Sequence, residues 1–350
     1  VRAALAGHEY THIYPDPEQR QLRAALADYT GAPAGNILPG HGADELIDLL
    51  TRIIVGPGDA IIDCPPTFGM YGFDAGLAGA QVVKVPRREN FHVDVPAIQK
   101  AAVEHPNAKL LFLTSPNNPV GNTLDLARLE RLLIENPESY IILDGVYTEF
   151  CETDATPLVQ KYPNLIVLRS FSKAFPVAGL RIGYLCASPE TAAIVRKLML
   201  QFSINHFALL FVDEMLSDRT FLEQARKTVL GIVAERERMY RLISQRFGHH
   251  TLKVFKSEGN FLLIRVLDRS VFENLMADLN RAGIKVLNTS GFPLLHDTFR
   301  VSIGAAYENE VFLHHLWTSL SQKALPAGKM EPLFPMQAIK FAQPVQKVRV

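Results

Sequence analysis

Three apolar runs, each typical of a β-strand buried on both faces, constrain the fold of this 350-residue chain most strongly. They are KLLFL at 109–113, YIIL at 140–143 and LIVLRS at 165–170, and stretches of helical periodicity separate them. Such an alternation is typical of a parallel sheet that helices cover on both faces. Ligands of these sheets bind at the carboxyl ends of the strands. We therefore expect the polar segments that follow the runs to meet at one edge: TSPNNPVG (114–121), LDGVYTEF (143–150) and SFSK (170–173).

Lys173 stands beside two hydroxyls, Ser170 and Ser172, and Arg181 follows eight residues later. A Lys amine can condense with the aldehyde of pyridoxal 5'-phosphate (PLP), while hydroxyls and a guanidinium hold the phosphate dianion. The motif S-x-S-K alone also suits an ordinary strand-to-helix turn with a surface Lys. Together with the two other polar segments, it indicates a PLP site.

Seven motifs in the same order resemble those of the fold-type I PLP-dependent aminotransferases, and within them the histidinol-phosphate aminotransferases. They are Y-P-D-P, G-x-G-A-D-E, P-P-T-F-G-M-Y, P-N-N-P-x-G, D-x-x-Y, S-x-S-K and R-V-S-I-G, and they run from about Tyr14 to Asn309. The resemblance implies an α/β fold, with a large domain built on a mostly parallel seven-stranded sheet and a smaller C-terminal α/β domain. It also implies a homodimer with shared active sites.

The resemblance gives roles to the residues around the cofactor ring. Lys173 would act as general base and acid in the proton shift of transamination. Asp144 would keep the pyridine nitrogen protonated, although a lone Asp at a strand end is more often a turn cap. Tyr147 and Asn118 would bind the phenolate oxygen, and Phe68 would stack on the ring. The Asn118 segment could otherwise be only a turn, since Asn and Pro favour turns.

The resemblance also implies how the phosphate and the substrate are held. The phosphate donors would be the helix start at Gly42, Ala43 and Asp44, together with Ser170, Ser172 and Arg181. Tyr14 would reach the phosphate of the neighbouring subunit, whereas otherwise it is a tyrosine packed on a loop. Arg300 would hold the substrate α-carboxylate as a bidentate pair, and Asn118 would also bind the substrate. A solvated strand Arg is the alternative.

Departures from the family pattern bear on the substrate. Gly145 replaces the acid of D-E-A-Y, Val120 replaces the Thr of N-P-T-G, and His206 and Phe207 are unlike the common pattern. If the lost acid at 145 stood next to the site, the pocket would be roomier. Amino acids with bulky or aromatic side chains would then be accepted as well as histidinol phosphate. The donor and the acceptor stay open at this point.

Sequence patterns also predict the domain organisation. Residues 30–245 are expected to form the large PLP-binding domain, and residues 1–29 and 246–322 the N-terminal segment and the small domain. A long helix at about 219–248 would cross between the two domains. The proline-containing tail at 323–350 is expected to have little regular structure, and the family's N-terminal arm is expected to be short or missing.

Composition excludes no class of small-molecule enzyme but argues against several other partners. Basic and acidic residues both number 36, so the net charge of zero gives no reason to bind nucleic acid or an anionic membrane. The three cysteines have no metal-ligand spacing and cannot all pair, which favours a reducing compartment. No apolar run reaches the ~20 residues that span a bilayer, and no signal peptide is visible. We expect a cytoplasmic protein without a metal.

Three functions are compatible with these motifs. The favoured one is an aminotransferase that moves an amino group between an amino acid such as glutamate and a 2-oxo acid or a ketone like that of histidinol phosphate. The second is a decarboxylase of the threonine-phosphate type, which shares the cofactor motifs. The third is a non-catalytic PLP-sensing domain, although its usual DNA-binding partner has no counterpart here.

Overall fold

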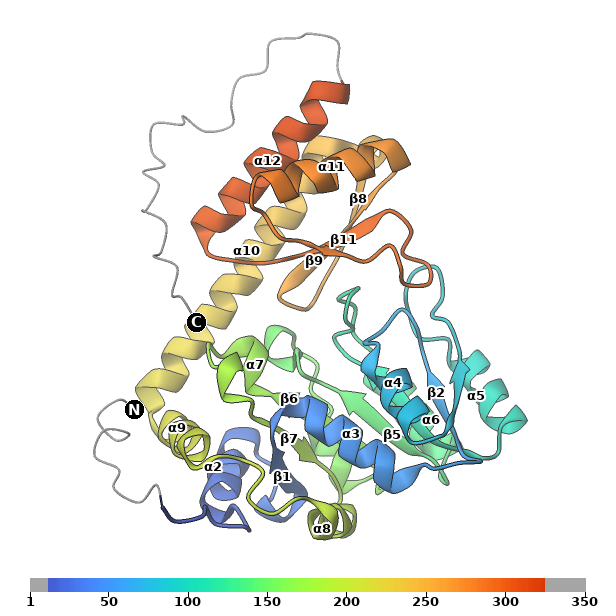
Figure 1. The fold of residues 1–350 in the computed structure, drawn as a ribbon, viewed down its shortest axis with the longest axis vertical. Helices are drawn as coiled ribbons and strands as arrows, with labels where there is room; N and C mark the ends of the chain where they lie inside the picture. The colour runs from blue at the N-terminus through green and yellow to red at the C-terminus, as the bar shows by residue number, and fades with distance from the viewer. Residues whose placement is uncertain (1–11, 325–350) are drawn as a thin grey trace.

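The computed structural model describes residues 12–324, which form a large and a small β-sheet with their helices (Figure 1). The expected N-terminal arm, and the expected tail apart from its first two residues, lie outside this range. The helices are α2 Arg20–Thr30, α3 Gly42–Ile54, α4 Met70–Leu77, α5 Val95–Glu104, α6 Leu126–Glu135, α7 Phe171–Ala174, α8 Pro189–Leu198, α9 His206–Ser217, α10 Arg219–Thr251, α11 Arg269–Arg281 and α12 Ala306–Ala324. Short 3-10 turns are η1 Ala34–Asn36, η2 Thr148–Phe150, η3 Thr156–Gln160 and η4 Ala178–Leu180.

The large sheet has seven strands in the order β1-β7-β6-β5-β4-β2-β3, which confirms the expected fold class. They are β1 Ile37–Gly40, β2 Ala60–Asp63, β3 Gln81–Lys84, β4 Ala108–Thr114, β5 Tyr140–Asp144, β6 Leu165–Ser170 and β7 Gly183–Cys186. Only β7 runs against its neighbours β1 and β6. β1 has no counterpart among the predicted runs, because its four residues include Pro39, which an edge strand tolerates.

Helices bury both faces of the large sheet, as the continuous apolar runs predict. Along β5, Ile141 and Leu143 face one core with side chains of α2, α5, α6 and α9. Ile142, between them, faces the other core with side chains of α3, α4 and α8. Because neighbouring residues of a strand point to opposite faces, every residue of the strand interior is apolar. Polar residues therefore lie at the strand ends.

The small sheet has four antiparallel strands in the order β10-β11-β9-β8. They are β8 Leu252–Phe255, β9 Phe261–Val266, β10 Leu287–Asn288 and β11 Thr298–Ser302. Side chains of α10, α11 and α12 pack with this sheet in a separate core. The polar turn at 256–260 separates β8 from β9.

The long helix α10 joins the two units, as predicted from its periodicity (Figure 1). Val229 in its first half packs in a core of the large sheet, whereas Met239 in its second half packs in the core of the small sheet. Within the stretch 1–29, Leu26 of α2 is buried against the large sheet rather than the small one. The expected domain boundaries stay a prediction.

Substitutions at two isoleucines test whether the interior of the large sheet is buried on both faces. Ile142→Ala removes a fully buried side chain that lies between Phe112 of β4 and Ile166 of β6. We expect a loss of about 2–5 kcal/mol in the free energy of unfolding, measured by denaturant titration. Ile134→Ala, on the exposed surface of α6, is the matched control and should change it by less than about 0.5 kcal/mol. Equal losses would contradict this account of the core.

Candidate active site

A cavity opens at the carboxyl ends of β5 and β6, beside the N-termini of α3 and α7. The strand order explains the site, because Asp144 and Ser170 end adjacent parallel strands. Ten residues proposed from the sequence line it: Ala43, Asp44, Phe68, Asn118, Asp144, Tyr147, Ser170, Ser172, Lys173 and Arg181. The wall also includes Ile47 and Val146, which motif reasoning missed because both lie in ordinary apolar surroundings.

Asp144 brings a carboxylate to the floor of this cavity and is only 4% exposed. Its Oδ2 accepts a hydrogen bond from the Tyr71 hydroxyl at 2.6 Å, and its Oδ1 accepts one from the Val146 N–H at 3.1 Å. Burial raises the pKa of Asp144, while the hydrogen bond from Tyr71 and the charge of Lys173 oppose the rise. Each oxygen keeps lone pairs for a further donor, so the carboxylate suits a protonated ring nitrogen.

Lys173 lies in the short helix α7, directly after β6. The Ser170 side chain caps this helix, because its Oγ accepts a hydrogen bond from the Ser172 N–H at 3.1 Å. The Lys173 amine lies 5.6 Å from the centre of the Tyr147 ring. Although the side chain stays open to the cavity, desolvation by the surrounding protein lowers the pKa of Lys173, and the charge of Arg300 adds to this. A lowered pKa favours the neutral amine, which is the nucleophilic form.

The start of α3 and Arg181 form an anion-binding corner. Gly42 has a φ of +81°, which favours glycine, and a Cβ there would stand 2.7 Å from Arg181 Nη2 and displace that guanidinium. Free N–H groups of the first helical turn attract anions. Arg181 donates to Asp44 Oδ2 at 2.8 Å and to Ser172 Oγ at 3.4 Å. A bound phosphate would therefore compete with the Asp44 carboxylate for this guanidinium.

Arg300 reaches the site from β11 of the small sheet. Its Nη1 donates to Asn118 Oδ1, and its guanidinium lies 4.8 Å from the centre of the Phe261 ring. The Arg300 Nε is buried and has no hydrogen-bond partner among the described residues. The Phe261 ring also packs edge-on against Tyr147, with ring centres 5.3 Å apart. Phe261 was not predicted, because it looks like any other apolar strand residue.

Phe68 and Tyr14 differ in how the structure places them. Phe68 lies on the loop between β2 and α4, half-buried in the cavity wall, where its ring can cover a flat ligand. Tyr14 is 77% exposed, lies outside the cavity wall and packs against Phe202, with ring centres 4.7 Å apart. One chain alone therefore does not bring Tyr14 to the site.

The expectation of a roomier pocket at Gly145 is wrong. Gly145 does not line the cavity, and a Cβ there would stand 2.8 Å from Thr148 Oγ1 and 3.1 Å from the Leu168 carbonyl oxygen. The absent acid thus faces the protein interior. Val120 is 2% exposed and packs with Phe91 and Leu263, also away from the cavity wall. Neither departure changes the site.

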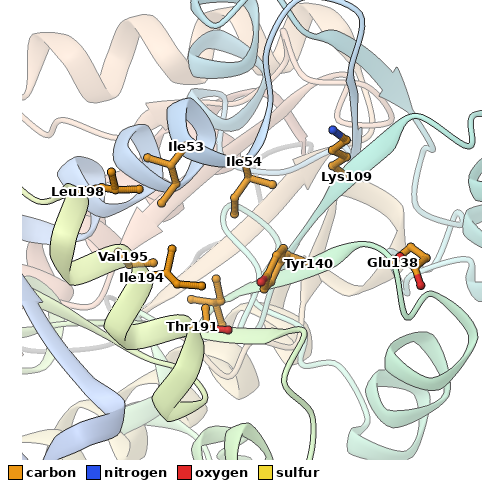
Figure 2. Close-up of a pocket in the computed structure, with 10 residues that line it drawn as sticks. Ile53, Ile54, Lys109, Glu138, Tyr140, Thr191, Ile194, Val195 and Leu198 are labelled. Atoms are coloured by element: carbon orange, nitrogen blue, oxygen red, sulfur yellow. The ribbon is translucent and has the colours of Figure 1, made fainter.

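A second cavity lies near the opposite edge of the large sheet, at the amino ends of β4 and β5 (Figure 2). Ile53 and Ile54 of α3, and Ile194 and Leu198 of α8, give it an apolar wall. The amine of Lys109 on its rim already pairs with Asp59 at 3.0 Å. Within residues 12–324 there is no group of His, Cys, Asp and Glu that could hold a metal, and no helix long and apolar enough to cross a membrane.

The donors of the first cavity fit PLP. The Asp144 carboxylate suits the ring nitrogen, Tyr147 and Asn118 offer donors for a phenolate, and Phe68 offers an aromatic face. The start of α3 at Gly42 and the guanidinium of Arg181 suit a phosphate dianion. A ligand that is positive at one end and negative at the other can therefore place its positive end against Asp144 and its negative end in the anion-binding corner.

Comparisons with known proteins agree with this geometry. The family model for aminotransferase class I and II matches residues 2–316. The histidinol-phosphate aminotransferase of Roseiflexus castenholzii is 41% identical over 310 residues, which cover 88% of this chain and 81% of that protein. The chloroplastic histidinol-phosphate aminotransferase of Nicotiana tabacum is 39% identical over 314 residues, covering 89% and 74%.

Solved structures share the fold. The histidinol-phosphate aminotransferase from Sinorhizobium meliloti, in complex with pyridoxal-5'-phosphate, superposes with a TM-score of 0.81 at 25% identity, covering 92% of this chain and 85% of that one. The L-threonine-O-3-phosphate decarboxylase from Porphyromonas gingivalis has a TM-score of 0.73 at 22% identity, covering 89% and 91%, which shows a common fold alone. The chain belongs to the class I and II aminotransferases, and it is a fold-type I, PLP-dependent aminotransferase of the histidinol-phosphate aminotransferase family.

Proposed function

We propose that this aminotransferase moves an amino group between glutamate and a ketone of the histidinol-phosphate type. The observation that carries the proposal is the convergence of Lys173, Asp144 and the anion-binding corner on one cavity, with Arg300 at its edge. Relatives named histidinol-phosphate aminotransferases support the substrate class. The interior position of Gly145 removes the reason to expect a different, bulkier substrate.

Each residue of the cavity then has a distinct role. When bound, PLP supplies a ring that accepts the electron pair left at the substrate α-carbon. Lys173 Nζ takes the proton from this carbon and later returns one. Asp144 holds the proton on the ring nitrogen, and Tyr147 and Asn118 bind the phenolate oxygen. The start of α3, which includes Gly42 and Ala43, binds the phosphate. Ser170, Ser172 and Arg181 donate further hydrogen bonds to it.

We also propose a homodimer in which Tyr14 completes the site of the partner. Tyr14 and Phe202 form an exposed aromatic pair, and Leu200 beside them is 76% exposed. Exposed apolar side chains that cluster in this way are typical of an interface. A tyrosine hydroxyl on such a surface can donate to a phosphate across a two-fold axis.

The cytoplasm is the compartment that we propose. Cys64 and Cys186 are buried and unpaired, and Cys151 is also free, which suits a reducing environment. The chain carries a net charge of zero, so small-molecule substrates remain the expected partners rather than nucleic acid or a membrane.

Asp144→Asn tests the role of the buried carboxylate. The amide cannot hold a protonated ring nitrogen by charge, so we expect kcat to fall by about tenfold to a hundredfold, the worth of one charge-assisted hydrogen bond. KM for glutamate should change little, because the interaction strengthens as charge develops. Asp125→Asn, on the exposed surface at the start of α6, is the control. A nearly normal kcat would show that another group serves the ring.

Arg300→Ala tests the binding of the carboxylate. We expect KM for glutamate to rise by about tenfold to a hundredfold, because one charged, forked contact is lost. KM for histidinol phosphate, which has no α-carboxylate, should rise much less. Arg300→Lys keeps the charge without the fork and should lie between the two. Equal rises for both substrates would contradict this role of Arg300.

Mixing variants tests the shared site. Lys173→Ala and Tyr14→Ala subunits, each impaired alone, should regain part of the activity when they are unfolded and refolded together, because some sites combine a native Lys173 with a native Tyr14. Mixing Lys173→Ala with the double variant is the control and should regain nothing. A fully active Tyr14→Ala protein, or an active monomer in sedimentation, would exclude the shared site.

A further inference from the structure

Tyr71 is the fully buried residue that contacts Asp144 from α4, and it was not among the candidate residues. Its hydroxyl donates to Asp144 Oδ2 at 2.6 Å and lies 2.9 Å from Thr114 Oγ1. Thr114 Oγ1 in turn lies 3.1 Å from Thr67 Oγ1. These four side chains form a continuous chain of hydrogen bonds beneath the cavity.

The direction of the chain follows from counting protons. A tyrosine hydroxyl has one proton, and here it goes to Asp144, so the contact with Thr114 must use the proton of the threonine. Thr67 must then donate to Thr114. All three hydroxyls point their protons toward the carboxylate, which polarises the chain and favours a charged Asp144. Protonation of Asp144 would remove the negative charge toward which these hydroxyl protons point.

Contacts with other aromatic rings hold the Tyr71 ring in place, in addition to the hydrogen bonds of its hydroxyl. It stacks on Phe112 with ring centres 4.6 Å apart and an angle of 5° between the planes. It also meets Phe68 edge-on at 5.7 Å. Burial holds the pKa of Tyr71 well above its usual value, so the hydroxyl stays protonated. Tyr71 therefore touches both Phe68, in the cavity wall, and the carboxylate that faces the ring nitrogen.

We propose that Tyr71 is a positioning residue for Asp144: its buried hydroxyl, oriented by Thr114, holds the carboxylate charged and aimed at the ring nitrogen of the cofactor. The proposal rests on the role proposed for Asp144. Lys173 from α7 also favours the charged carboxylate, whereas Asp44 from α3 opposes it. Tyr71 and the Val146 N–H are the neutral donors to this carboxylate, and Tyr71 alone of the two donates through a side chain.

The affinities of the cofactor-free enzyme for two ligands distinguish the positioning role of Tyr71 from a merely structural one. The probes are PLP and its carbocyclic analogue, in which C–H replaces the ring nitrogen. Asp144 can distinguish them only through the ring nitrogen, so the quantity to measure is the ratio of their dissociation constants. General damage to the cavity would weaken both ligands alike and leave the ratio unchanged.

We expect wild-type protein to prefer PLP, and Tyr71→Phe to reduce this preference by about tenfold or more, toward the value of Asp144→Ala. Tyr71→Phe keeps the ring and its stacking. Tyr184→Phe removes an equally buried hydroxyl from β7, outside the cavity wall, and should keep the wild-type ratio. Thr114→Val, which leaves Tyr71 in place without its donor, should give a smaller reduction.

Three results would overturn the proposal in different ways. A wild-type preference retained in Tyr71→Phe but lost in Asp144→Ala would leave the role of Asp144 standing and exclude that of Tyr71. A wild-type protein that binds both ligands equally would exclude the role of Asp144, and that of Tyr71 with it. A ratio lowered as much by Tyr184→Phe as by Tyr71→Phe would also count against Tyr71.

Discussion

A buried carboxylate at the end of β5 is the constraint around which the cavity is organised. Asp144 is 4% exposed, and an ionised group withdrawn from water costs several kcal/mol unless donors and positive charge surround it. The Tyr71 hydroxyl, the Val146 N–H and the charge of Lys173 provide part of this compensation. A protonated ring nitrogen would provide the rest. Both carboxylate oxygens accept one hydrogen bond within the protein, and each keeps a lone pair with which it could bind the ring nitrogen.

The second determinant is the anion-binding corner in the same cavity. Gly42 admits Arg181 to the start of α3, where helix N–H groups and a guanidinium face the same space. Together, the Asp144 carboxylate and this corner suit a ligand that carries a pyridinium and a phosphate. Arg300 comes from the other sheet and contacts Asn118, so its proposed contact with the substrate would depend on how the small unit packs on the large one.

Motif order predicted the fold class and most of the cavity wall, because strand ends in a parallel sheet meet at one edge whatever the intervening helices contain. The sequence could not predict where side chains point. Gly145 was interpreted as a gap in the site, yet its missing side chain would face Thr148 and Leu168. Phe261 looks like a core residue and meets the site through its contact with Tyr147. Tyr71 ends the motif P-P-T-F-G-M-Y, yet only the tertiary structure shows its hydrogen bond to Asp144. The edge strand β1 carries a proline and no apolar run, so periodicity alone did not detect it.

The most direct test of the account is the position at which the cofactor is attached. Borohydride reduction of the purified holoenzyme should fix the cofactor covalently, and mass spectrometry of the digested protein should then locate it. Because Lys173 alone among the residues lining the cavity carries an amine, the account predicts modification of the peptide that contains Lys173. Modification at a different lysine, with the Lys173 peptide recovered unmodified, would contradict it.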